Sequence, residues 1–159
     1  MTAMKEAAAE FLSKKRIAVA GVSRDSGGAH GGNPVYVRLR DRGYEVVPVN
    51  PNATEVEGDT CYPNVKVIPG GVDAVVIGTH PDVAESVMRD CIDAGIRHVW
   101  MHRGPGGGSV SEAATKLGRD AGVTVIDGGC PLMYAPTADF GHKMMKGVLS
   151  LVGKVPKTV

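Results

Sequence analysis

The stretch Arg16-Ile17-Ala18-Val19-Ala20-Gly21-Val22-Ser23 decides the fold, because it is a short apolar run that leads directly into a glycine turn. An uninterrupted apolar run of this length is typical of a central parallel strand, since helices cover both faces of such a strand. Residues 24–33 are polar and rich in glycine, and a helical pattern follows them. Strand, turn and helix N-terminus together present backbone N–H groups and a helix dipole, so the stretch predicts a phosphate-binding turn.

The bulk properties of the chain limit its class. A length of 159 residues predicts one domain, residues 1–159, and a net charge of +1 gives no reason to expect nucleic acid or a membrane surface as a partner. Three cysteines without a Cys-x-x-Cys pair predict unpaired thiols in a reducing compartment. The sequence has neither a signal peptide nor a membrane-spanning run, so we expect a soluble, cytoplasmic protein. The histidines lack zinc-site spacing, and no metal is expected.

Apolar runs and helical periodicity outline the fold. The runs predict five strands, at residues 17–20, 45–49, 74–77, 98–101 and 123–126. The helical patterns lie in residues 1–15, from about 33 to 42, and in 82–94, 109–120 and 139–151, with a short tail at 152–159. Alternating strands and helices predict an α/β, Rossmann-like, doubly wound parallel sheet with helices on both faces. For the five strands, numbered along the chain, we predict the order 3-2-1-4-5.

Residues suited to an anionic ligand follow the predicted strands. Ligands of such sheets bind at the carboxyl ends of the strands, beside the first strand. The residues at these ends are Gly21, Val22, Ser23 and Arg24, then Asn50, Pro51 and Asn52, then Thr79, His80 and Pro81, then His102, Arg103 and Gly104, and finally Cys130. Glycine, hydroxyl, imidazole and guanidinium groups are frequent at this edge, and carboxylates are few, with Asp127 at the end of the fifth strand. We therefore expect an anionic ligand at this edge.

The first turn does not complete the dinucleotide fingerprint. That fingerprint needs three glycines as G-x-G-x-x-G and an acidic residue after the second strand, which binds the ribose hydroxyls. Here only Gly21 of the three glycines is in place, and Asn50 stands where the acid is expected. NAD is therefore disfavoured. An NAD(H)-binding redox sensor or dehydrogenase-like protein remains an alternative.

Several candidate residues could also have a purely structural role. Gly21 and Ser23 either cradle a phosphate or form an ordinary turn between strand and helix, and Arg24 either pairs with a phosphate or is solvated. His80 either lines the ligand site or caps a helix. Cys130 either faces the ligand, where its thiol could react, or is a buried structural thiol. The glycine-rich loop 27–32 either orders over a ligand or is simply mobile. Asn33 is suited to cap the helix that follows this loop.

Five short motifs carry a resemblance to a known family. They are Ala20-Gly21-Val22-Ser23, Val49-Asn50-Pro51-Asn52, Cys61-Tyr62-Pro63, Val99-Trp100-Met101 and Gly129-Cys130-Pro131. In this order they resemble the small bacterial CoA-binding proteins, whose domain is similar to the N-terminal domain of the succinyl-CoA synthetase alpha subunit. The resemblance spans about residues 16–131 and implies a Rossmann-like fold that binds coenzyme A at the carboxyl edge of its sheet.

The resemblance also implies roles for the candidate residues. Gly21 and Ser23 would hold the CoA diphosphate, residues 50–52 would flank the adenosine, and residues 79–81 would line the path to the pantetheine arm. Residues 102–104 match a loop that contacts CoA in the synthetase, although the run of glycines after Arg103 departs from that pattern. The synthetase's phosphorylated histidine lies in a second domain that this sequence lacks. The resemblance thus implies binding of CoA or an acyl-CoA without catalysis, and an enzyme that acts on CoA thioesters or disulfides through Cys130 is an alternative. Separately, the mixed polar and apolar segment 139–145 could pack against a second copy, so a homodimer or an unidentified partner protein is a further expectation.

Overall fold

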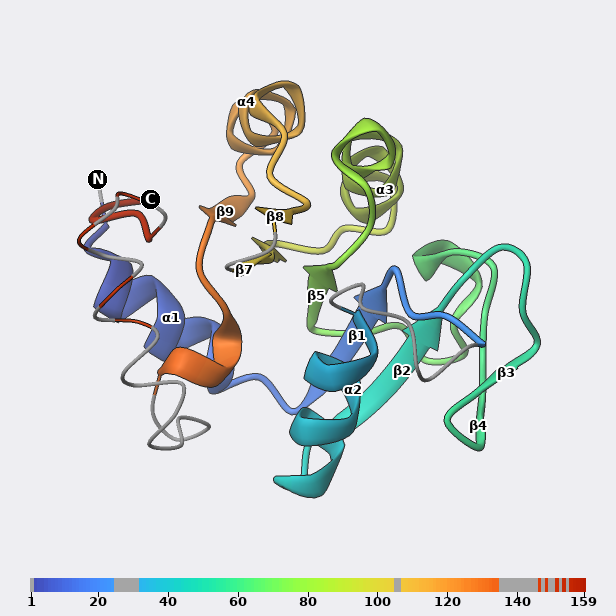
Figure 1. The fold of residues 1–159 in the computed structure, drawn as a ribbon. Helices are drawn as coiled ribbons and strands as arrows, with labels where there is room; N and C mark the ends of the chain where they lie inside the picture. Colours follow the sequence, from blue (N-terminus) through green and yellow to red (C-terminus); the bar gives the residue numbers. More distant parts are fainter. Residues whose placement is uncertain are drawn as a thin grey trace.

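The centre of the computed structural model is a five-stranded parallel sheet; the structure describes residues 2–24, 32–104, 107–134, 146, 148, 151, 153 and 155–159. The strands are β1 (Arg16–Ala20), β2 (Glu45–Val49), β5 (Ala74–Ile77), β6 (His98–Met101) and β9 (Thr124–Asp127). They lie in the order β2-β1-β5-β6-β9 (Figure 1). The predicted α/β, Rossmann-like class and its five parallel strands are confirmed.

The residues that fill the third place in the strand order differ from the prediction. Residues 74–77 were expected beyond the second strand, but β5 pairs with β1 on the opposite side from β2. The place beside β2 is taken by the segment at Tyr62, which forms a single parallel bridge with Val49. Counted as the third strand, this segment restores the 3-2-1 order. A single bridge leaves no apolar run in the sequence, so the pattern of apolar runs gives that place to residues 74–77.

Helices cover both faces of the sheet (Figure 1). On one face lie α1 (Met4–Leu12), α2 (Gly32–Asp41) and the short 3-10 helix η2 (Pro131–Met133), and their apolar side chains form one buried cluster with the sheet. On the other face α3 (Pro81–Asp93) and α4 (Glu112–Asp120) form a second cluster. All four residues of β5 are buried, because they are covered from both sides. This explains the uninterrupted apolar runs of the sequence.

Short elements complete the fold around the sheet. Two small antiparallel hairpins are formed by β3 (Glu55–Val56) with β4 (Asp59–Thr60) and by β7 (Arg103–Gly104) with β8 (Gly107–Gly108). A 3-10 helix, η1 (Val65–Val67), precedes β5. None of the helices in the described part of the chain has the length and apolar character of a transmembrane segment.

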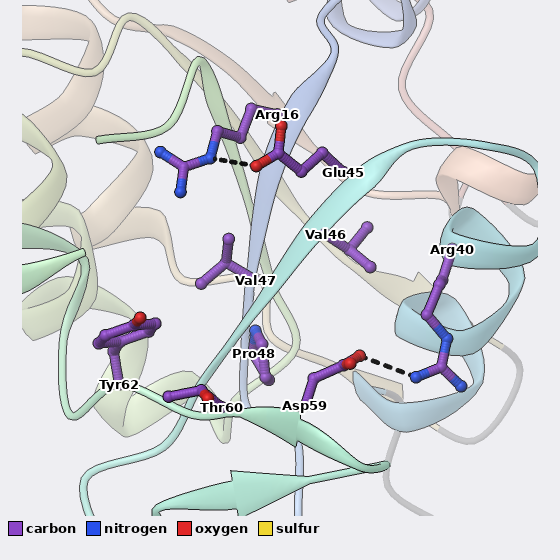
Figure 2. A pocket seen from close by; sticks show the side chains of 9 residues that line it. All are labelled: Arg16, Arg40, Glu45, Val46, Val47, Pro48, Asp59, Thr60 and Tyr62. Atoms are coloured by element: carbon purple, nitrogen blue, oxygen red, sulfur yellow. Dashed lines mark hydrogen bonds and ion pairs between the residues drawn. The ribbon is translucent and has the colours of Figure 1, made fainter. Parts of the chain in front are cut away.

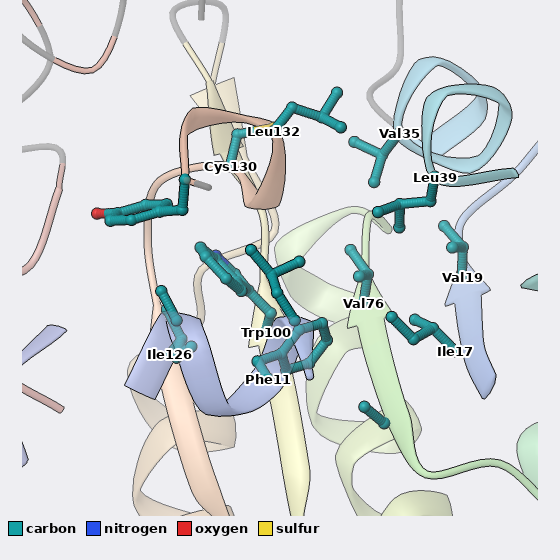
Figure 3. Packing of buried hydrophobic residues seen from close by; sticks show 14 of the residues in the cluster. Phe11, Ile17, Val19, Val35, Leu39, Val76, Trp100, Ile126, Cys130 and Leu132 are labelled. Carbon is teal, nitrogen blue, oxygen red and sulfur yellow. The ribbon is translucent and has the colours of Figure 1, made fainter. Parts of the chain in front are cut away.

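The N-terminal helix packs on the core as its sequence pattern predicts. α1 buries Phe11 against Trp100 of β6 with an edge-to-face geometry, at 5.4 Å between ring centroids and 86° between planes (Figure 3). The Trp100 indole N–H donates to the Gly128 carbonyl at 2.9 Å, so its polar atom is satisfied in the core.

The end of the chain is not a free tail. The backbone N–H of Val159 donates to the Thr2 carbonyl at 3.0 Å, and Ala3 forms an antiparallel bridge with Thr158. The predicted helix at 139–151 lies mostly outside the described residues, and the proposed lid at 27–32 lies outside them except for Gly32.

Candidate functional site at the carboxyl edge of the sheet

The chain leaves β1 and β5 toward opposite sides of the sheet, since β1 is followed by β2 on one side and β5 by β6 on the other. The helix that follows β1 covers one face of the sheet and the helix that follows β5 covers the other (Figure 1). The carboxyl ends of two such strands form the topological switch point, where open α/β sheets bind their ligands. Gly21 and Gly78 lie there, and the N–H of Gly78 donates to the Ala20 carbonyl at 2.7 Å. The structure therefore brings the first and third predicted residue groups together, as the sequence predicted.

Three glycines let the backbone segments meet at this point. A Cβ atom on Gly21 would lie 2.5 Å from the Thr79 nitrogen and closer still to the Gly78 carbonyl, and Gly21 has a φ of +93°. A Cβ on Gly32, the first residue of α2, would lie 2.5 Å from the Gly21 oxygen. In the dinucleotide fingerprint the third glycine allows this close packing of helix and strand. Here Gly32 and Gly78 take that role, and sequence reasoning missed them because neither stands at the fingerprint spacing.

Asn33 fastens the turn rather than capping the helix. α2 begins at Gly32, so Asn33 lies in its first turn, and the expectation of an N-cap at Asn33 is wrong. Its Oδ1 accepts the Ser23 N–H at 2.7 Å, and its Nδ2 donates to the Ser23 carbonyl at 2.8 Å. The side chain is only 4% exposed. The Ser23 backbone N–H and carbonyl are thus both engaged within the protein.

Asn50 ties the second strand to the same turn. Its Nδ2 donates to the Val22 carbonyl at 2.7 Å, and its Oδ1 accepts the Asn52 N–H at 2.7 Å. A carboxylate could not donate to the carbonyl of Val22. This gives a physical reason for an amide at the position where dinucleotide-binding folds carry an acid. Pro51 and Asn52, which follow it, are exposed.

The residues after β5 begin α3. Pro81 is the first residue of that helix, and His80 is its N-cap, with Nδ1 accepting the Asp82 N–H at 3.4 Å. The Thr79 hydroxyl donates to the His80 carbonyl at 3.0 Å. The His80 side chain is 72% exposed and lies 3.3 Å from the Asp82 carboxylate. Capping, one of the two readings of His80, is what the structure shows, and the imidazole remains open to solvent.

The glycine run after β6 forms the hairpin of β7 and β8. Arg103 pairs with Gly108, and Gly104 pairs with Gly107. A Cβ on Gly108 would lie 2.5 Å from the His102 carbonyl oxygen, so the hairpin needs a glycine there. The N–H of Arg103 donates to the Gly129 carbonyl at 2.8 Å, and the N–H of His102 donates to Ile77 at 2.9 Å. His102 and Arg103 are half-buried at the predicted edge.

Cys130 lies in the hydrophobic core. It is 2% exposed, belongs to the cluster that contains Trp100 and Leu132, and directly precedes η2 (Figure 3). Of the two interpretations of Cys130, the structure agrees with a buried structural thiol. The three cysteines, all in the described part of the chain, form no disulfide. Burial raises the pKa of Cys91 to about 12 and also raises the pKa of Cys61, so both thiols stay protonated near neutral pH.

A hollow of about 340 Å³ lies elsewhere, along the outer side of β2 (Figure 2). Its charged side chains are paired within the protein, Arg16 Nε with Glu45 at 3.0 Å and Arg40 Nη1 with Asp59 at 2.8 Å. Two cations balanced by two carboxylates give no net attraction for an anion. We therefore place the candidate site at the carboxyl edge rather than in this hollow. In the described residues no group of three or more acidic, histidine or cysteine side chains is arranged to hold a metal ion.

The fold and its glycine-lined switch point define a Rossmann-like α/β domain. The chain belongs to the CoA binding domain family, which it matches over residues 15–136. The family resemblance predicted from the sequence motifs is confirmed at this level.

Several known proteins are similar to this chain. The uncharacterized protein YneT of Bacillus subtilis is 31% identical over 113 residues, 70% of this chain and 78% of that protein. The Acetate–CoA ligase [ADP-forming] II of Archaeoglobus fulgidus is 36% identical over 85 residues, which are 52% of this chain but only 12% of the ligase. This chain therefore corresponds to a small part of that enzyme.

Solved structures show the same fold. A hypothetical protein from Pyrococcus horikoshii OT3 superposes with a TM-score of 0.74 at 28% identity, covering 90% of this chain and 92% of that one. The dinucleotide forming Acetyl-coenzyme A synthetase 1 of Ca. Korarchaeum cryptofilum, in complex with phosphate and ADP, gives a TM-score of 0.57 at 30% identity. The match covers 70% of this chain and 25% of the synthetase.

Proposed function

We propose that this protein binds coenzyme A, or an acyl-CoA, at the carboxyl edge of its sheet, without a chemical step of its own. Membership of the CoA binding domain family supports the ligand. The proposed position of the ligand rests on one observation, the close contact of Gly21, Gly32 and Gly78 at the switch point. The diphosphate would lie beside the turn at residues 21–24.

The charges at this edge suit a ligand with several phosphates. Arg24 is exposed, and Arg103 is half-buried on the neighbouring hairpin. CoA carries a phosphate on the ribose 3′ oxygen, so it lacks the free ribose diol that an acidic residue would bind. The neutral amide of Asn50 avoids repelling that phosphate, and this favours CoA over NAD. In this proposal residues 50–52 flank the adenosine, and residues 79–81 and 102–104 border the pantetheine arm.

The burial of Cys130 supports binding without thiol chemistry, because a sulfur that is 2% exposed cannot meet a thioester at the surface. We assign no ligand contact to this residue. The absence of disulfides among the three described cysteines supports a reducing compartment such as the cytoplasm.

Isothermal titration calorimetry with CoA, dephospho-CoA and NADH at one salt concentration tests the proposal. We expect CoA to bind at least about tenfold more tightly than the other two, because only CoA brings the 3′-phosphate. The substitution Arg24→Gln should weaken CoA binding, whereas Arg42→Gln, at an exposed position beyond the far end of α2, should not. No heat with millimolar CoA, or equal affinity for NADH, would contradict the proposal.

A further inference from the structure

The hairpin of β3 and β4 contains a strained residue. Among the non-glycine residues that the structure describes, Glu57 alone has a positive φ, at 51°. It is followed by Gly58 with a φ of 80°, so both central residues of this two-residue turn are left-handed. Such turns strongly favour Asn-Gly or Gly-Gly, and glutamate is a poor choice for the first position. A non-glycine residue held in this conformation suggests that its side chain has a task.

The backbone and the side chain of Glu57 make different contacts with α2. The carbonyl oxygen accepts a hydrogen bond from Arg40 Nη1 at 2.8 Å, and any residue at position 57 would supply this acceptor. The carboxylate Oε1 accepts a hydrogen bond from Asn33 Nδ2 at 3.0 Å. Only this second contact depends on glutamate. The hairpin is further anchored by the Tyr36 hydroxyl, which donates to the Asp59 carboxylate.

The carboxylate stabilises the same orientation of the Asn33 amide that the Ser23 backbone requires. A carboxylate only accepts, so the nitrogen of the amide must face Glu57 and its oxygen must face the other way. That oxygen accepts the Ser23 N–H at 2.7 Å, while the same Nδ2 donates to the Ser23 carbonyl at 2.8 Å. With the amide reversed, two oxygens would face each other at Glu57 and two donors would meet at Ser23. Glu57 therefore reinforces the hydrogen bonds between Asn33 and Ser23, which lies 34 residues earlier in the chain.

We propose that Glu57 is a positioning residue, which acts through Asn33 to hold the Gly21–Arg24 turn in the conformation that receives the ligand diphosphate. The affinity part of this inference rests on the proposed CoA function. It also gives a reason for a strained glutamate close to a site for anions, where a carboxylate is otherwise unfavourable.

The substitutions Glu57→Gly and Glu57→Asn test this role, because both residues fit a left-handed turn and both keep the carbonyl that Arg40 binds. Glycine has no side chain and asparagine is one carbon shorter, so neither reproduces the contact with Asn33. Glu57→Gln keeps an acceptor oxygen at the full length. Glu55→Gln removes the same charge from an exposed position of the same hairpin and serves as the control.

We expect the glycine and asparagine variants to melt within about 3 °C of the parent, since relief of strain offsets the lost contact. In these variants the Ser23 amide should exchange with deuterium at least about tenfold faster, and CoA should bind about tenfold more weakly. Glu57→Gln and Glu55→Gln should match the parent in both measurements.

Two results would overturn the inference. One is unchanged Ser23 exchange in the glycine and asparagine variants; the other is unchanged CoA affinity in variants whose Ser23 exchange is faster. Failure of the parent protein to bind CoA would instead remove the proposed function, and the exchange data would still decide whether Glu57 controls the turn.

Discussion

The two ends of β1 use polar groups in opposite ways. At its amino end, Arg16 donates through Nε to Glu45 at 3.0 Å and through Nη1 to the Pro69 and Gly71 carbonyls. Its backbone N–H donates to the Asp73 carboxylate at 3.2 Å. The charge of this arginine is therefore neutralised and satisfied by the protein itself.

At its carboxyl end, neutral amides hold the backbone in place. Asn33 binds Ser23 and Asn50 binds Val22, while the charged side chain of Arg24 is exposed. The difference teaches that the charge at the amino end is neutralised within the protein, whereas the carboxyl end is held by hydrogen bonds and still presents a charge to solvent. A turn fixed by hydrogen bonds beside an exposed cation suits an anionic ligand.

The largest expected effect comes from the glycine contact. Gly21→Ala places a Cβ against the Gly78 carbonyl and forces a positive φ on alanine, so it should lower the free energy of unfolding by at least about 3 kcal/mol. Gly43→Ala is the matched control, because Gly43 has a φ of +87° but nothing within 4 Å of its Cβ position. It should lose only about 1 kcal/mol. Equal losses in urea unfolding would show that the close contact at the switch point is unimportant.

The next effect concerns the amide at the end of β2. Asn50→Asp removes the donor to the Val22 carbonyl and sets two acceptors against each other, which should destabilise the protein by about 2 kcal/mol. The added charge should also weaken CoA binding by roughly tenfold. Asn52→Asp adds the same charge at an exposed position two residues later and should cause a smaller change in both quantities. Urea unfolding and calorimetry measure the two effects, and equal behaviour of the variants would contradict this role of Asn50.

The strands of the sheet are easier to predict from the sequence than the contacts at the edge of the sheet. The five strands were predictable because burial on both faces leaves apolar runs such as Ala74–Ile77, all four of whose residues are buried. The place of that strand was not predictable, because the segment at Tyr62 occupies the outer side of β2 through one bridge only. The contacts of Asn33 with Ser23 and Glu57 join three separate segments of the chain. They depend on side-chain geometry, so no local sequence pattern predicts them.

A smaller effect is expected from the core thiol. Cys130→Ala removes a buried sulfur and should cost about 1–2 kcal/mol of stability. The affinity for CoA should not change, because the thiol belongs to the core rather than to the edge of the sheet. Calorimetry and urea unfolding separate the two quantities. A loss of CoA binding with unchanged stability would instead revive the hypothesis of an enzyme that uses this cysteine.

The smallest effect appears only in acid. The hydrogen bond from Tyr36, assisted by Arg40, holds the pKa of Asp59 below its usual value of 3.8, against the opposing effect of burial. A carboxyl group with a lowered folded-state pKa stabilises the protein above its unfolded pKa, and that stability is lost as the pH falls through the folded pKa. Tyr36→Phe should therefore move the acid-unfolding midpoint upward, by less than about one pH unit because Asp59 is partly exposed.

Circular dichroism during acid titration measures this shift. Tyr44→Phe provides the control, since the Tyr44 hydroxyl donates to the Leu12 carbonyl at 2.6 Å and to no titrating group. If both tyrosine variants gave the same acid midpoint, the hydroxyl of Tyr36 would not be the cause of the lowered pKa.

The most direct test of the whole account compares the two ends of β1 in one experiment. Backbone amide chemical shifts of the isotopically labelled protein are followed by NMR while CoA is added. We predict that the shifts concentrate at residues 21–24, 50–52, 79–81 and 102–104, while Arg16, Glu45 and the hollow along β2 stay unchanged. Shifts centred on Arg16, Glu45 and Thr60, with none at the turn after β1, would contradict the account.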